Sequence, residues 1–177
     1  MFMVINSEVE MNNVYFDIEY RNIVSDILEN EEFKKLEDIR HHGSNRLDHV
    51  IRVSYSSYKK AKKLGLDYKS VARAGLLHDF FLDSNEHIKK SKRVKLLYKH
   101  PKYALTNALK YFELNDKEKD IILTHMFPIG FNIPKYIESW LVDIVDDYIA
   151  LMEKVTILYK QLSSAFVFLF ILLINNL

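Results

Sequence analysis

The chain contains no cysteine, and only 4 glycines and 3 prolines occur among its 177 residues. The absence of cysteine excludes disulfide bonds and thiolate metal ligands. A metal site would therefore use imidazole nitrogen and carboxylate oxygen, a donor set that suits Mn, Fe, Co, Ni or Zn without choosing among them. So few turn-forming residues also argue against a β-sandwich or a barrel, whose many short strands need frequent turns.

An excess of charge of one sign is missing as well, since 25 Lys and Arg stand against 24 Asp and Glu. The net charge therefore gives no general attraction to nucleic acid or to a membrane surface. The first residues, Met1 to Asn6, have neither the basic region nor the apolar core of a secretory signal, so we expect a cytoplasmic location. With 49% hydrophobic and 28% charged residues, the composition is that of a globular domain.

Only one long hydrophobic run occurs, and it lies at the C-terminal end. Ala165 to Ile174 are all apolar, but a helix that spans a bilayer needs ~20 such residues. Lys160 and Gln161 interrupt any extension of the run toward the N-terminus. We therefore divide the chain into a domain of residues 1–160 and a hydrophobic tail of residues 161–177. We expect the tail to dock on the domain or on a neighbouring subunit, with contact to a membrane surface as the less favoured alternative.

Apolar residues recur at helical spacing along most of the chain, and no segment shows the alternation of a strand. Asn45, Asp67 and Asn115 are suitable N-cap residues, and Gly65 suits the left-handed position after a helix. Pro101 fits the first turn of a helix, which leaves residues 80–99 as an irregular, Lys-rich connection. The predicted helices cover about 15–39, 45–64, 68–78, 101–112, 115–125 and 134–155. The predicted class is all-α.

The histidines are the main indication of chemistry. His49 lies within one predicted helix, the pair His78-Asp79 ends the next, His100 precedes a helix, His125 ends another, and Asp146 lies in the last. Taken singly, each has a structural explanation, such as a helix cap, a satisfied core residue or a histidine favoured by the helix dipole. Taken together, they supply nitrogen and oxygen ligands from several helices, an arrangement that can hold two metals ~3.5–4 Å apart.

The local sequence resembles a known family. The segment Ala72 to Asp79 reads Ala-Arg-Ala-Gly-Leu-Leu-His-Asp, and it is preceded by Arg46-x-x-His49 and followed by His and Asp in later helices. This order resembles the HD superfamily of metal-dependent phosphohydrolases, over roughly residues 22–154. The resemblance implies an all-α HD-domain bundle. It also implies that His49, His78, Asp79 and Asp146 hold one metal, and that His100 and His125 add a second, with Asp79 bridging the two.

Two assignments stay open at this point. Asp143, Asp146 and Asp147 compete for the last ligand position, and at about 100° per residue Asp146 points nearly opposite the apolar stripe of its helix. Periodicity therefore does not select Asp146, whereas the resemblance does, because Asp146 follows Val145. Phe80-Phe81 stands where many HD domains have Ile-Gly, and these rings pack in the core or line a pocket.

The resemblance implies hydrolysis of a phosphate ester by a metal-activated water, with Asp79 orienting the water. Arg46, one helical turn before His49, is then expected to hold the phosphate of a small substrate such as a nucleotide. A basic run from Lys89 to Lys102 is either solvated charge or an electrostatic funnel for such a substrate, and we expect no dedicated nucleic-acid surface. Rival hypotheses are a di-iron oxygenase with the same ligands and a non-catalytic nucleotide-binding module. The sequence leaves the oligomeric state open.

Overall fold

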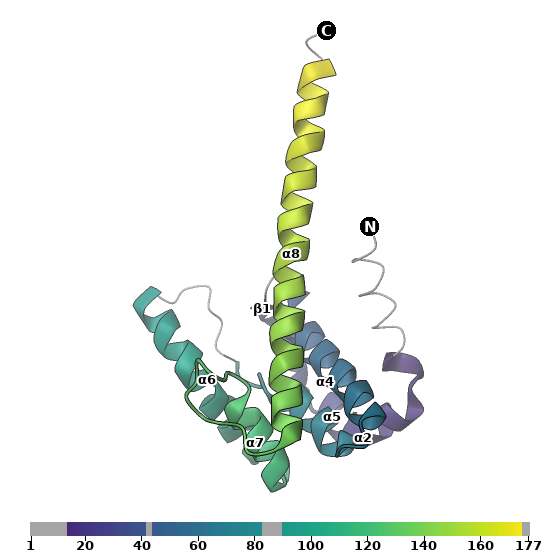
Figure 1. Ribbon diagram of the computed structural model, residues 1–177, viewed down its shortest axis with the longest axis vertical. Helices are drawn as coiled ribbons and strands as arrows, with labels where there is room; N and C mark the ends of the chain where they lie inside the picture. Colours follow the sequence, from purple (N-terminus) through teal and green to yellow (C-terminus); the bar gives the residue numbers. More distant parts are fainter. Residues whose placement is uncertain (1–13, 42–43, 83–89, 175–177) are drawn as a thin grey trace.

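Helices make up nearly all of the described structure, which confirms the all-α class (Figure 1). The computed structural model describes residues 14–41, 44–82 and 90–174, without the side chains of residues 40, 41, 44, 90–97 and 167–174. The helices are α2 (Ile18–Leu28), α3 (Glu31–Lys34), α4 (Arg46–Lys63), α5 (Tyr68–Leu77), α6 (Lys90–Tyr111), α7 (Asp116–Thr124) and α8 (Ile137–Ile174). A 3-10 turn η1 (Lys35–Asp38) and two antiparallel two-residue strands, β1 (Arg40–His41) and β2 (Ser44–Asn45), connect α3 to α4.

The predicted caps define where three of the helices begin. The side chain of Asn45 accepts a hydrogen bond from the backbone N–H of Asp48, and Asp67 caps α5 in the same way. Asn115 forms a capping box with Glu118 at the start of α7. Gly65 follows α4 with a positive φ of 70°, a conformation that glycine adopts without strain.

Helices α4 and α5 approach each other closely at the centre of the bundle. A Cβ atom placed on Gly75 would lie 2.8 Å from the Cα atom of Ser54, so only glycine fits at this crossing. The hydroxyl of Ser54 donates to the carbonyl of Ala72 across the same interface, at 2.6 Å. This contact fixes α5 against α4. It lies a few residues from His49, which belongs to α4, and from His78, which is the C-cap of α5.

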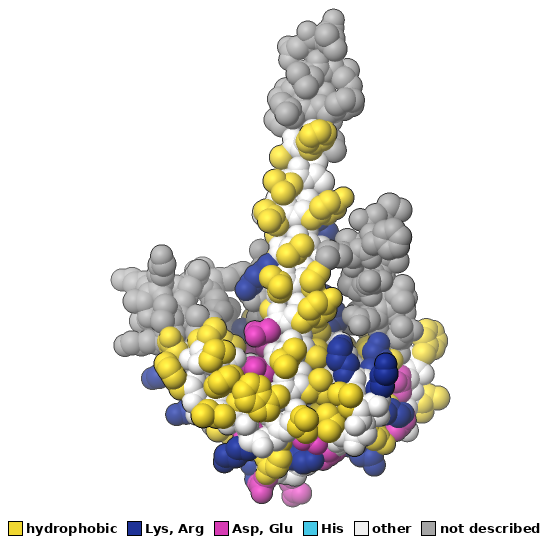
Figure 2. Space-filling model, in the orientation of Figure 1, with side chains coloured by type: hydrophobic (Ala, Val, Ile, Leu, Met, Phe, Trp, Pro, Cys, Tyr) yellow, Lys and Arg dark blue, Asp and Glu magenta, His cyan; other side chains and the backbone are white. Residues whose placement is uncertain are grey.

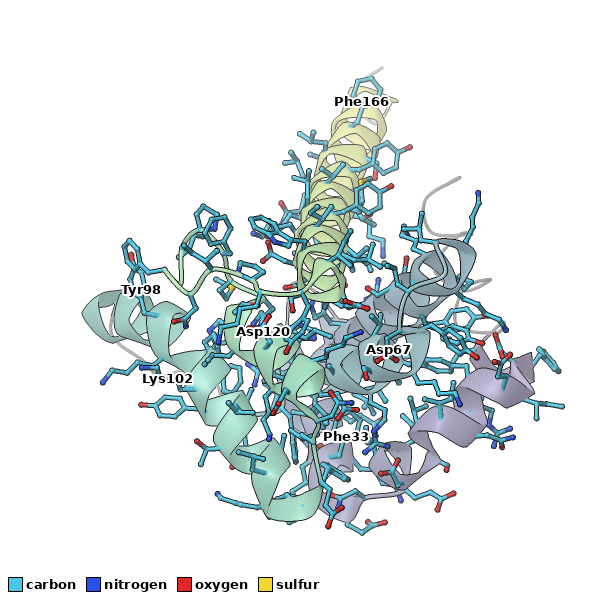
Figure 3. The ribbon with its side chains drawn as sticks, turned by 60° about the horizontal axis from the view of Figure 1, so that its bottom comes forward. Phe33, Asp67, Tyr98, Lys102, Asp120 and Phe166 are labelled. Atoms are coloured by element: carbon cyan, nitrogen blue, oxygen red, sulfur yellow. The ribbon has the colours of Figure 1, made fainter. Side chains whose placement is uncertain are left out.

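Asp120 of α7 fixes the start of α8 (Figure 3). Its carboxylate accepts hydrogen bonds from the hydroxyl of Ser139, at 2.7 Å, and from the backbone N–H of Lys135, at 2.9 Å. The rings of Phe127 and Trp140 add an edge-to-face contact 5.0 Å between centroids. Since α8 is anchored here, the position of Asp146 two turns further along is determined by the bundle.

The first half of α8 packs on the bundle, while its second half extends well beyond it (Figure 1). The side chains of Leu158, Leu162 and Phe166 are 56%, 62% and 75% exposed. In Figure 3, Phe166 accordingly lies far from the bundle. The described part of the predicted tail thus does not dock on its own domain, and its side chains from Val167 onward lie outside the described residues. Among the side chains that are described, no helix has the length and apolar character needed to cross a membrane.

Two predicted boundaries were wrong. The stretch from residue 15 to 39 divides into α2, α3 and η1, because Asn30 caps a new helix after α2 ends. Helix α6 begins at Lys90, so Pro101 lies inside it and His100 does not cap it. A proline removes one hydrogen bond to the preceding turn, and the Lys, Arg and Leu residues of 90–99 are good helix formers that sustain the helix upstream.

Candidate metal centre

The fold brings together all six residues that were predicted to bind metal. His49 comes from α4, His78 is the C-cap of α5, His100 lies in α6, His125 is the C-cap of α7, and Asp146 lies in α8. Asp79 follows His78 directly. Each of the six is at most 8% exposed, so the cluster is buried within the bundle.

One half of the cluster surrounds Asp146. Its Oδ1 atom lies 2.9 Å from Nε2 of His49 and 3.7 Å from Nε2 of His78. Donor atoms that share one ion through bonds of ~2.1 Å are separated by roughly 3.0–3.5 Å, so these distances are close to those of a ligand set. The donor atoms of His49, His78 and Asp79 also lie within 4.8 Å of one another, which brings Asp79 to the same position.

The other half surrounds Asp79. The Nε2 atoms of His100 and His125 are 2.8 Å apart, and they lie 3.3 Å and 3.6 Å from Oδ1 of Asp79. Asp79 thus belongs to both halves, through His49 and His78 on one side and through His100 and His125 on the other. A carboxylate at this place is suited to bridge two cations.

Hydrogen bonds to the backbone orient two of the imidazoles. Nδ1 of His78 donates to the carbonyl of Gly75, and Nδ1 of His125 donates to the carbonyl of Ile122, both at 2.8 Å. Because a carbonyl only accepts, the neutral ring carries its lone pair on Nε2, directed into the cluster. Nε2 of His78 is buried and has no hydrogen-bond partner among the described residues. The lone pair on Nε2 of His78 is thus buried near the carboxylates of Asp79 and Asp146. A nitrogen lone pair beside carboxylate oxygens is a suitable ligand set for a cation, so these residues fit a divalent metal.

The charges of the cluster are strongly coupled. Burial alone would raise the pKa of Asp146, but His78 and His49 outweigh it and lower the pKa to about 2. The pKa of Asp79 is likewise held well below its usual range, against burial, by His125, His100, His78 and Arg46. Burial opposes the charged form of His49, yet Asp146 and Glu153 raise its pKa to about 10. Both carboxylates are therefore anionic at neutral pH.

Glu153 is a member of the site that the sequence analysis missed. Nδ1 of His49 donates to Oε1 of Glu153 at 3.3 Å, and the guanidinium of Arg52 holds the same oxygen at 2.8 Å. This pair fixes the ring of His49 so that Nε2 faces Asp146. A carboxylate behind a ligating histidine orients the ring and raises its basicity. The available signal was the seven-residue spacing from Asp146 to Glu153, which places both on one face of α8.

We expect Glu153→Ala to weaken metal binding by about 10- to 100-fold, because His49 loses the group that orients it. The affinity for Mn²⁺ or Zn²⁺ is measured by competition with a chromogenic chelator. The matched control is Glu113→Ala, which removes an exposed glutamate outside the cluster and should leave the affinity unchanged. Equal affinities of Glu153→Ala and the wild type would show that Glu153 does not support the site.

The structure separates the three competing aspartates. Asp146 points into the cluster and Asp147 is exposed, whereas Asp143 is buried with its Oδ1 atom lacking a hydrogen-bond partner among the described residues. The helical stripe that was assumed to face the core is in fact largely exposed, with Ile137, Ile144 and Tyr148 at 63%, 62% and 59%. Asp146 lies opposite this stripe and therefore faces inward, as the family resemblance indicated.

Asp143 should make the metal-free protein less stable as the pH rises. Burial, with a smaller contribution from Asp147, raises its pKa to about 7, compared with ~3.9 in the unfolded chain. Between these values the folded state holds a proton that the unfolded state has lost, so this residue's contribution to stability falls with increasing pH. Asp143→Asn cannot ionise, and we expect it to be more stable than the wild type by roughly 2 kcal/mol at pH 8, with the difference vanishing near pH 4.

The measurement is urea unfolding with a chelator present, at pH 4.5 and pH 8. Asp116→Asn is the control, since the side chain of Asp116 is 86% exposed. A difference between Asp143→Asn and the wild type that stays constant across this range would contradict the assignment.

Arg46 is buried, at 1% exposure. Its guanidinium donates to the carbonyl of Phe81, lies 3.8 Å from the centre of the Phe81 ring, and has Nε 3.9 Å from Oδ2 of Asp79. Phe80 packs in the core against Phe33, at 5.5 Å between centroids. Phe81 is buried as well, but its ring lies 5.3 Å from that of His100, at the edge of the cluster.

The predicted basic run is only partly described. Lys99 and Lys102 are exposed on α6, and the other side chains of the run lie outside the described residues. Lys102 is labelled in Figure 3. The electrostatic funnel therefore stays a prediction.

Comparison with known proteins yields one match. The family model of the HD domain matches residues 46–151, which is more than half of the chain. No curated protein and no solved structure matched. The matched segment contains all six residues of the cluster. HD domains are of the metal-dependent phosphohydrolase type and bind divalent metals.

Proposed function

Because the chain belongs to the HD domain family, we propose that it hydrolyses the phosphate ester of a small molecule with a metal-activated water. The observation that carries this proposal is the buried cluster of four imidazoles and two carboxylates, arranged in two halves that share Asp79. A cluster with a missing or displaced ligand would favour a binding module without catalysis. Here every predicted donor lies within the cluster.

In this proposal His49, His78, Asp79 and Asp146 hold one divalent ion, and Asp79, His100 and His125 hold a second. Such ions lower the pKa of bound water and neutralise charge on the phosphate. Mn, Fe, Co, Ni and Zn all accept this donor set.

The protein's own groups then orient the reactants. Asp79 is ionised at neutral pH, so its oxygens only accept hydrogen bonds, and it can fix the direction of a water molecule that donates to it. Arg46 was predicted to hold the phosphate. Since its side chain is buried and contacts Asp79 and Phe81, we propose instead that it positions Asp79. A site buried inside a bundle suits a small phosphoester, such as a nucleotide, better than a phosphate within a folded polymer.

The first test is the metal content. Wild-type protein saturated with Mn²⁺ and freed of excess metal should retain close to two ions per chain, as measured by mass spectrometry of the metal. The double variant His100→Ala, His125→Ala should retain one, because the half around Asp146 is intact. A wild type that never holds more than one ion rules out the binuclear site.

The second test is activity. We expect Asp79→Ala to lose hydrolysis of a phosphoester panel by at least about 10³-fold, because both halves of the site lose their shared ligand. Circular dichroism should show that the helices persist. Asp116→Ala serves as the control, since that side chain is exposed in α7. Retained hydrolysis with metal bound would disprove the assignment, and oxygen consumption by the iron-loaded protein without hydrolysis would favour the oxygenase hypothesis.

A further inference from the structure

Apolar side chains recur along α8 with alternating steps of four and three residues. The positions are Ile137, Leu141, Ile144, Tyr148, Leu151, Val155, Leu158 and Leu162. This mean period of 3.5 residues is the signature of a helix that packs along another helix, since it keeps the apolar seam facing the partner. We call these eight residues the α8 stripe.

Seven of the eight residues of the α8 stripe are exposed, and Leu141 is partly buried against the core. Ile144, Leu151 and Leu158 are 62%, 57% and 56% exposed, and Leu162 is 62% exposed. Figure 2 shows hydrophobic side chains recurring along α8, from the bundle to the end of the described side chains. Monomeric soluble proteins rarely expose a continuous apolar surface of this extent.

The opposite face of α8 differs in character. Where α8 contacts the bundle, this face carries Val142, Ile149 and the site residues Asp146 and Glu153. Beyond the bundle it carries Lys160, Ser163 and Ser164, which are exposed and polar. The helix is therefore amphipathic up to Ser164. Its stripe is apolar and mostly exposed to solvent, whereas the opposite face either packs on the bundle or carries polar residues.

We propose that two copies of this chain pair through the α8 stripe, as an antiparallel two-helix coiled coil. From Ile137 to Leu162 the stripe extends over about 38 Å, and a seam roughly 10 Å wide covers on the order of 400 Å² on each copy. Specific interfaces bury at least about 500 Å² on each partner, so the pairing also uses the exposed residues that flank the stripe, such as Trp140, Asp147 and Lys154. This inference does not depend on the proposed function.

Charges at the edge of the stripe favour the antiparallel orientation. Asp147 and Lys154 are both exposed, and they occupy equivalent flanking positions one heptad apart. In an antiparallel pair, Asp147 of one copy lies beside Lys154 of the other, and the symmetry makes this contact twice. A parallel pair would bring Asp147 beside Met152 and Lys154 beside Tyr159, and it would pair neither charge.

The same register matches the apolar layers. Ile137 of one copy then packs against Leu162 of the other, and Ile144 against Val155. Tyr148 packs against Leu151 at the centre. In this register every residue of the stripe packs against a stripe residue of the other copy, as expected for an apolar seam with 4-3 spacing.

The oligomeric state of the full chain tests the pairing. We expect a dimer by analytical ultracentrifugation in detergent-free buffer, and at least roughly 100-fold weaker association for the variant Leu151→Asp, Leu158→Asp, because each dimer would bury four unpaired charges. The control variant Ser163→Asp, Ser164→Asp adds the same charge on the other face and should remain a dimer. A monomeric wild type overturns the proposal. A wild type that binds phosphatidylcholine vesicles as a monomer would also overturn it, because the stripe would then contact lipid and not a second copy.

Cysteine cross-linking tests the orientation, because the chain has no cysteine of its own. In the antiparallel pair, Leu162 of one copy lies about 38 Å from Leu162 of the other, too far for a disulfide, whose Cα atoms are at most ~7 Å apart. Leu162→Cys alone should therefore not cross-link, whereas a mixture with Ile137→Cys should. Efficient cross-linking of Leu162→Cys alone would overturn the antiparallel arrangement.

Discussion

Asp79 and Asp146 carry negative charge inside a bundle that largely excludes water, and transferring an ionised carboxylate into such surroundings costs several kcal/mol unless other charges compensate it. The arrangement of the helices reflects this constraint. The ends of α5 and α7 and the interior of α4 and α6 each direct an imidazole at one of these two carboxylates. Arg46 adds a permanent positive charge beside Asp79. The bundle is therefore built to keep both carboxylates ionised, the state that a cation site requires.

Local signals in the sequence predicted the starts of α4, α5 and α7, because a cap involves only residues within one turn. Asn45, Asp67 and Asn115 behave as expected for this reason. The family order of His and Asp predicted which residues would meet, and the structure brings them together. Pro101 misled the prediction, since a proline near the middle of a strongly helical segment weakens the helix without ending it.

The orientation of α8 could not be predicted from its own periodicity. An amphipathic pattern shows that one face is apolar, but it does not say whether the protein's own core or another molecule covers that face. If the protein's own core covered the stripe, Asp146 and Glu153 would lie in solvent. Most of the α8 stripe faces outward instead, and the bundle covers the face that carries the two carboxylates. For this reason Glu153 was missed, and only the family resemblance identified Asp146.

The pKa values indicate how the cluster exists before a cation binds. His49, with a pKa of about 10, holds a proton at neutral pH between Asp146 and Glu153, and this charge replaces part of what a cation would supply. His78, whose pKa burial lowers, stays neutral and keeps its Nε2 lone pair available. A cation that enters must then displace the proton of His49 while it uses the lone pair of His78 directly. The bundle can thus assemble around its buried carboxylates without metal, and one ring of the same half remains ready to bind it.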